Sequence, residues 1–185
     1  MRLLTFLMRK AVFLLLLWLP AILCVSSCSH SVNAGTVCTV SYDDVRPTQF
    51  GVGLSEVDCK RGRLESMSKS ELAAFLAQSK NYFPTIVGPH GYFITDHHHL
   101  ARALWDADIS SSQKIIYLSI TDNWSSMKVD DFWQAMVNQN LTWLNDEKGL
   151  GPIAPEHLSA DVGGLVNDLY RSLAYFLNHA VRNSV

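Results

Sequence analysis

The chain has 185 residues, of which 48% are hydrophobic and 17% are charged, and this composition excludes a largely disordered protein. The length suits one compact domain. Residues 1–27 hold three basic and no acidic residues, so the rest has 12 basic residues (15 minus 3) against 17 acidic ones, a balance of −5. This balance argues against a protein that coats nucleic acid, because Lys and Arg supply most non-specific affinity for phosphate.

The N-terminal residues have the pattern of an export signal. Basic residues in the first ten positions precede an apolar run over 11–25, which is shorter than the roughly 20 residues that span a bilayer. Processing at residues 25–28 (VSSC), a bacterial lipobox pattern, would lipidate Cys28 and anchor the chain to the membrane. Processing after residues 32–34 (VNA) would instead release a soluble protein. We expect a signal over 1–28, a linker over 29–36, and a periplasmic or membrane-anchored bacterial protein.

Two further cysteines, Cys38 and Cys59, lie beyond the signal in a chain predicted to reach an oxidising compartment. A disulfide between them is one expectation. Two separate core cysteines are the alternative, because the sequence does not fix the distance between them.

Strands and helices are expected to alternate through a single domain over 37–182. Strands are predicted at 37–45, 84–87, 92–95 and 114–120, and helices at 68–79, 97–107, 129–144 and 160–181. Ser68 and Glu71 form a capping box, and Gly88 to Gly91 have the residue types of a hairpin turn. The glycine-punctuated stretch from 46 to 67 is predicted to be a loop. This order of elements indicates an α+β or mixed α/β fold.

The junction of residues 96–102 (DHHHLAR), where a strand runs into a helix, is the strongest candidate site. Asp96 is placed to cap the helix, and three histidines fill the first turn although the helix dipole disfavours cations there. A bound anion explains this choice, because helix N-termini donate N–H groups to phosphate or carboxylate.

Helical geometry separates the side chains of this junction. At 100° per residue, His98, Arg102 and Asp106 share one polar stripe, with His99 at its edge and His97 nearer the buried side. We therefore predict that His98 and Arg102 face one anionic ligand, with His97 as a structural hydrogen-bonding residue. His98 or His99 would act as general base, and Arg102 would stabilise phosphate charge.

Two alternatives stay open at the junction. His90, Asp96 and the histidine triplet could bind a divalent metal, although consecutive helical residues point 100° apart and cannot all reach one ion. A polar helix start without any ligand is the other alternative.

Four segments resemble the ParB-like putative nuclease branch of the ParB/sulfiredoxin superfamily. They are residues 92–104 (YFITDHHHLARAL), 46–49 (RPTQ) with the following Gly53 and Lys60, 86–91 (IVGPHG) and 170–174 (YRSLA). The likeness extends from about Val40 to Phe176. It implies a small α+β fold with a mixed sheet, flanking helices and a C-terminal helical extension, whose strand–helix junction binds phosphate. By this resemblance the phosphate site consists of His98, His99 and Arg102, with Asp96 organising the turn. Related members bind and hydrolyse CTP, use ATP, or phosphorylate free serine.

The resemblance also shows departures. Many members read Asp-Gly-His-His-Arg at the junction, whereas this chain has His97 in place of the glycine and Leu100 in place of the arginine. The reactive cysteine of sulfiredoxins has no counterpart in the motif. Serine kinases have a catalytic glutamate where Thr48 and Gln49 stand, and Glu56 is the nearest carboxylate that could serve as its substitute.

Lys60 and Arg171 remain as outlying candidates. Lys60 could extend the phosphate site or belong to a solvated basic loop, and Arg171 could join the site or pair with Asp168 three residues earlier. Two functions follow. One is an exported nuclease or phosphoryl-transfer enzyme acting on nucleic acid or a nucleotide, and the other is a non-catalytic envelope protein that binds a small anion or a protein partner. The sequence predicts no oligomeric state.

Overall fold

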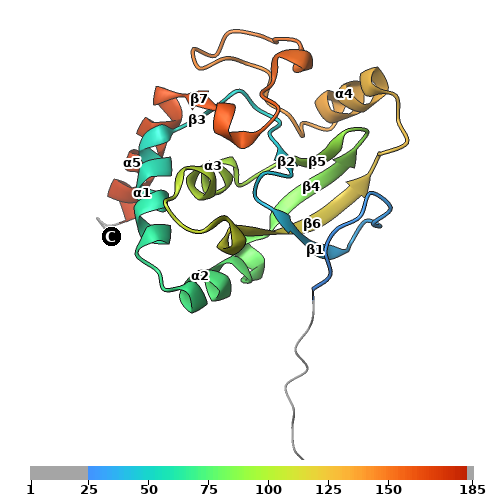
Figure 1. The fold of residues 1–185 in the computed structure, drawn as a ribbon. Helices are drawn as coiled ribbons and strands as arrows, with labels where there is room; N and C mark the ends of the chain where they lie inside the picture. The colour runs from blue at the N-terminus through green and yellow to red at the C-terminus, as the bar shows by residue number, and fades with distance from the viewer. Residues whose placement is uncertain (1–24, 183–185) are drawn as a thin grey trace, which may run out of the picture.

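The computed structural model describes residues 25–182 and contains a five-stranded mixed sheet (Figure 1). Its strands are β1 (Val37–Ser41), β2 (Val45–Arg46), β4 (Phe83–Gly88), β5 (Gly91–Ile94) and β6 (Ile115–Asn123), in the spatial order β1-β6-β4-β5-β2. The β1–β6 and β4–β5 pairs are antiparallel, whereas β4–β6 and β2–β5 are parallel. The predicted α+β fold with a mixed sheet is therefore confirmed.

Residues 25–182 contain five α-helices. They are α1 (Leu54–Glu65), α2 (Lys69–Leu76), α3 (His98–Asp106), α4 (Val129–Asn138) and α5 (Leu169–Arg182). Side chains of α1, α2 and α3 join those of the strands in the main core, whereas α4 covers a smaller cluster that includes Phe93, Trp124 and Phe132. Within residues 25–182, no helix combines the length and apolar character that crossing a bilayer requires.

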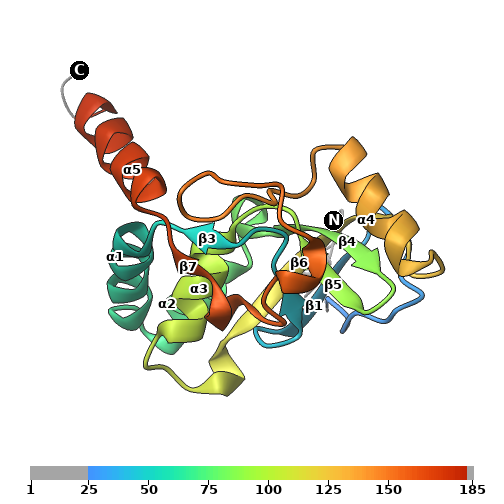
Figure 2. The same cartoon turned by 90° about the horizontal axis from the view of Figure 1, so that it is seen from above.

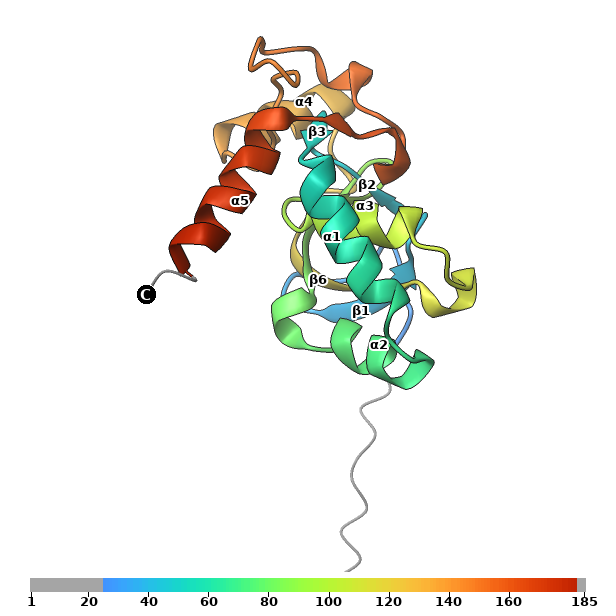
Figure 3. The same cartoon turned by 90° about the vertical axis from the view of Figure 1, so that its left-hand side faces the viewer.

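A two-stranded parallel pair brings the starts of α1 and α5 together. Strand β3 (Gly51–Val52) leads into α1, and its partner β7 (Val166–Asn167) leads into α5. The two helices diverge from this shared start, and α5 projects from the body of the molecule (Figures 2 and 3). A Cβ on Gly53 would lie 2.6 Å from the backbone nitrogen of Ser172, so only glycine allows this approach.

Several predicted elements agree with the structure. The capping box is present, since Ser68 Oγ accepts from the Glu71 N–H and the Glu71 carboxylate accepts from the Ser68 N–H, and it starts α2. The predicted hairpin is β4–β5, whose turn is closed by the Gly88–Gly91 pair with Gly91 at φ 135°. The predicted strand at 114–120 is β6, which continues to Asn123.

The predicted loop over 46–67 is wrong, because residues 54–65 form α1. This helix buries only Val57 and Leu64 and has a glycine in its interior, so its sequence shows little amphipathic pattern. Its packing against α3 supplies the stability that local preference lacks.

Two helices are shorter than the sequence predicts. Helix α4 ends at Asn138 rather than at 144, because Asn140 adopts a left-handed conformation and the Leu141 N–H returns to the Met136 carbonyl. Helix α5 begins at Leu169 rather than at 160. Asp168, the residue before it, accepts hydrogen bonds from the first free N–H groups of the helix, including that of Tyr170.

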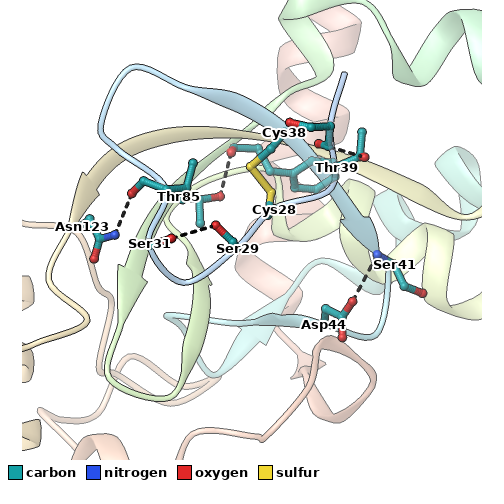
Figure 4. The surroundings of a disulfide bond; sticks show 12 residues. Cys28, Ser29, Ser31, Cys38, Thr39, Ser41, Asp44, Thr85 and Asn123 are labelled. Carbon is teal, nitrogen blue, oxygen red and sulfur yellow. Dashed lines mark hydrogen bonds between the residues drawn. A yellow bond between two sulfur atoms is a disulfide. The ribbon is translucent and has the colours of Figure 1, made fainter. Parts of the chain in front are cut away.

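The cysteine pairing also differs from the prediction. Cys38 forms a disulfide with Cys28 (Figure 4). Cys59 on α1 is a free and exposed thiol. Cys38 points from β1 into the core, so it cannot meet the outward-facing Cys59. Residues 29–36, the predicted linker, lie between the two bonded cysteines.

Candidate functional site

The strand–helix junction has an unusual backbone. The residue that caps α3 is His97, at φ 62° in the left-handed region, and not Asp96 as predicted. Asp96 instead accepts a hydrogen bond from the His97 N–H at its Oδ1 (2.6 Å). The left-handed conformation explains why related sequences have glycine here, because a side chain is strained in it. The His97 ring lies edge-on to Phe83, and no hydrogen bond of its side chain is seen among the described residues, so its structural contact is aromatic and not the predicted hydrogen bond.

His98 lies in the interior and not at a ligand surface. Its residue is only 4% exposed, and its Nε2 accepts a hydrogen bond from the Thr48 N–H at 3.1 Å. Burial lowers the pKa of His98 to about 3, and the opposing effect of Asp96 does not compensate. The structure thus corrects the expectation that His98 binds phosphate or acts as general base. The ring fixes the chain before β3 to the start of α3.

Arg102 also has a structural position. Its Nε donates to Asp106 at 2.7 Å, and its Nη1 donates to the Leu165 carbonyl at 2.6 Å. The predicted polar stripe therefore exists, but the segment before β7 covers it. Arg102 holds this segment, and so the start of α5, against α3. The prediction that Arg102 contacts phosphate is corrected.

His99 is the histidine of the triplet that reaches a cavity. Its Nε2 accepts from the Gly53 N–H at 3.0 Å and lies 3.5 Å from Oε2 of Glu56. Burial lowers the pKa of His99, with Arg171 and Lys60 adding to the effect and Glu56 opposing it. A neutral ring whose Nε2 accepts from Gly53 cannot form an ion pair with Glu56 through the same atom. His99 therefore orients the start of α1 by a hydrogen bond to its backbone.

The cavity beside His99 has a volume of about 460 Å³ and lies between α1, α3 and α5. We call it the α1–α5 cavity, and it is lined by Glu56, Lys60, His99, Arg171, Ala174, Tyr175 and Asn178. Four of these residues are sequence-predicted candidates from three distant segments. Tyr175 and Asn178 were missed, although their spacing of four and seven residues from Arg171 on a predicted helix indicates a shared face.

The charges of the cavity are partly balanced. Lys60 Nζ lies 3.3 Å from Oε1 of Glu56, and Arg171 Nε lies 3.3 Å from Oδ2 of Asp168, the pair expected from their spacing. Lys60 and Arg171 are each about one third exposed at their side chains, so both can exchange these partners for a ligand. Burial, with smaller effects of Cys59 and Glu56, raises the pKa of Tyr175 and keeps its phenol a hydrogen-bond donor. The cavity thus offers two cations and a phenol to an anion.

The geometry gives little support to the alternative of a metal site at the junction. In the part of the chain that the structure describes, no group of three or more His, Cys, Asp or Glu side chains is placed to hold a metal ion. His90 lies on the β4–β5 turn and lines a larger, mainly apolar cavity of about 980 Å³ beside α4. That cavity contains none of the residues predicted to bind phosphate.

Comparisons with known proteins found one family model and a similar solved structure. The family model described as "Putative ParB-like nuclease" matches residues 38–183. Among solved structures, the chain is similar to the crystal structure of protein Atu1540 from Agrobacterium tumefaciens, with 28% sequence identity and a TM-score of 0.64. The match covers 78% of this chain and 68% of that one. No curated protein matches the sequence.

Proposed function

Because the chain belongs to the ParB-like putative nuclease family, we propose that its α1–α5 cavity binds the phosphate of a nucleic acid or nucleotide and cleaves a phosphodiester bond. The observation that carries the proposal is the convergence of Glu56, Lys60, His99 and Arg171 on one cavity from three elements. These residue types are the ones that phosphodiester hydrolysis needs, since cations neutralise the phosphate and a carboxylate accepts a proton from water.

Each residue has a distinct role in this proposal. The guanidinium of Arg171 and the ammonium of Lys60 bind the phosphate oxygens, and the Tyr175 phenol donates to one of them. When Lys60 moves to the phosphate, Oε1 of Glu56 becomes free to accept a proton of the attacking water. As the water oxygen bonds to phosphorus, a P–O ester bond breaks, and the leaving oxygen takes up the proton that Glu56 accepted. His99 acts as a positioning residue that holds α1, and hence Glu56, through the Gly53 N–H.

The test is cleavage of single- and double-stranded DNA and RNA by the purified chain, with and without Mg²⁺. Glu56→Gln is expected to lower the rate by about 10²- to 10⁴-fold while leaving binding nearly unchanged. Arg171→Gln is expected to weaken binding. Arg61→Gln is the matched control, because Arg61 pairs with Asp58 on the same helix and does not line the cavity. Absence of cleavage under every condition, or full activity of Glu56→Gln, would reject the nuclease.

One observation favours the second candidate, a non-catalytic anion-binding protein. The two side chains of the cavity that could act as general base, His99 and Glu56, already have partners. His99 Nε2 accepts from the Gly53 N–H, and Glu56 pairs with Lys60. Calorimetry with inorganic phosphate and a dinucleotide separates the candidates. Binding that Arg171→Gln abolishes, with no turnover of any substrate, supports this second function.

A further inference from the structure

Residues before β1 form part of the sheet. The Cys28 N–H donates to the Thr39 carbonyl at 2.9 Å, and the Thr39 N–H donates to the Ser26 carbonyl at 3.0 Å. Residues 26–28 therefore run beside β1 and extend the sheet at this edge. The disulfide from Cys28 to Cys38 closes this pairing covalently (Figure 4).

The segment between the two cysteines is also held. The side-chain amide of Asn123, at the end of β6, donates to the carbonyls of both His30 and Val32, at 3.0 and 2.7 Å. The His30 ring stacks on Tyr92, and the Gly35 N–H donates to the Ile120 carbonyl. Val32 packs against the main core. Residues 26–36 are thus attached to the domain by hydrogen bonds, a ring contact and the disulfide, although most of them are exposed.

These contacts conflict with both processing sites predicted from the sequence. Lipidation of Cys28 would place a thioether on the same sulfur that bonds to Cys38, and one sulfur cannot carry both. Cleavage after Ala34 would remove Cys28 from the chain, together with the His30 ring that stacks on Tyr92 and the two carbonyls that accept from the Asn123 amide. A third arrangement keeps the disulfide and the contacts of residues 28–36.

We propose that the mature protein begins at or before Cys28, carries no lipid, and is closed by a disulfide between Cys28 and Cys38 formed after export. In this reaction two thiols lose two protons and two electrons to a disulfide-carrying oxidant by thiol–disulfide exchange, and the oxidant becomes a dithiol. Such exchange is characteristic of oxidising compartments outside the bacterial cytoplasm. The proposal does not depend on the function of the α1–α5 cavity.

One tryptic peptide can test all parts of this proposal. The sequence has no Lys or Arg between Lys10 and Arg46, and trypsin does not cut between Arg46 and Pro47, so the N-terminal peptide of the mature chain ends at Lys60. This peptide shows where the chain begins, and it contains Cys28, Cys38 and Cys59. The full chain, expressed with its own leader in a bacterium, is alkylated before and after reduction and analysed by mass spectrometry.

The expected peptide starts at or before Cys28 and is lighter than its reduced form by two hydrogen atoms. Alkylation without reduction modifies Cys59, and reduction exposes Cys28 and Cys38 to the same reagent. A diacylglyceryl mass on Cys28, a peptide that starts at Gly35, or free thiols at both Cys28 and Cys38 would each overturn the proposal.

Serine variants give a second measurement. Cys28→Ser and Cys38→Ser are expected to lower the melting temperature equally, and the double variant no further, because all three lose the same bond. Cys59→Ser is the control and should change nothing. If Cys28→Ser instead moves the protein from the membrane to the soluble fraction while Cys38→Ser does not, Cys28 is a lipid anchor and the proposal is wrong.

Discussion

Two neighbouring histidines, His98 and His99, illustrate how strongly single residues depend on their surroundings. Both accept a hydrogen bond from a backbone N–H at Nε2, from Thr48 and Gly53 respectively. His98 is enclosed, whereas His99 borders the α1–α5 cavity. His98 therefore fixes a segment of the interior, whereas the neighbouring His99 positions a residue at the edge of the cavity.

The buried His98 predicts a loss of stability in acid. Its pKa is about 3 in the folded chain and about 6.5 in the unfolded chain, so below pH 6.5 the unfolded state binds a proton that the folded state does not. The free energy of unfolding should fall as the pH decreases from 6.5 towards 3, by up to about 1.4 kcal/mol per pH unit from this group. Urea titrations at several pH values measure it. His98→Gln should show a shallower slope, and an equal slope would contradict the assignment.

The left-handed His97 predicts a difference between two substitutions. His97→Gly and His97→Ala both remove the ring contact with Phe83, but only glycine is unstrained at φ 62°. We expect the glycine variant to be more stable than the alanine variant by about 1 kcal/mol. Denaturant unfolding of both variants measures this, and equal stability would show that the junction is not strained.

At the scale of elements, the parallel pair β3–β7 decides where the α1–α5 cavity forms. Each strand feeds one helix, so Lys60 on α1 and Arg171 on α5 share a wall although 111 positions (171 minus 60) separate them in the sequence. Hydrogen bonds from Arg102 to Leu165 and from Gly53 to His99 fasten both helix starts to α3. The cavity is therefore a product of element packing.

Two glycines of the same region make a matched test of this arrangement. In Gly53→Ala, the new Cβ would clash with the Ser172 backbone, so we expect a loss of about 1–3 kcal/mol and weaker phosphate binding as α5 shifts. In Gly62→Ala, the Cβ meets nothing within 4 Å inside α1, so stability should rise by about 1 kcal/mol with binding unchanged. Thermal unfolding and phosphate calorimetry measure both. Similar behaviour of the two variants would contradict a close α1–α5 contact.

For the whole molecule, charge limits the kind of nucleic-acid binding that the proposed function allows. The acidic balance beyond residue 27 argues against a protein that coats nucleic acid, and the α1–α5 cavity supplies only Lys60 and Arg171 as permanent cations. Recognition would thus involve a few phosphates at one point.

This charge distribution predicts a weak dependence of binding on salt. With two phosphate contacts, the affinity for a short single-stranded oligonucleotide should fall with a log–log slope of about −1.4, or about −0.7 for each contact. Fluorescence anisotropy over a range of NaCl concentrations measures the slope. Lys60→Gln should reduce it to about −0.7, whereas Arg61→Gln should leave it unchanged. A much steeper slope would indicate a larger basic surface than the cavity offers.

The sequence by itself determined features that depend on neighbouring residues. The capping box of α2 and the glycine turn of β4–β5 could be predicted because their hydrogen bonds and dihedral angles involve residues close in the chain. The candidates Glu56, Lys60, His99 and Arg171 were also found, by residue type and family resemblance. Only the tertiary structure decided which of them meet, since His98 and Arg102 have the same polar character but lie beneath chain segments about 50 and 60 residues away in the sequence. It likewise decided that Cys38 pairs with Cys28, because the direction of a side chain from a strand depends on the sheet around it.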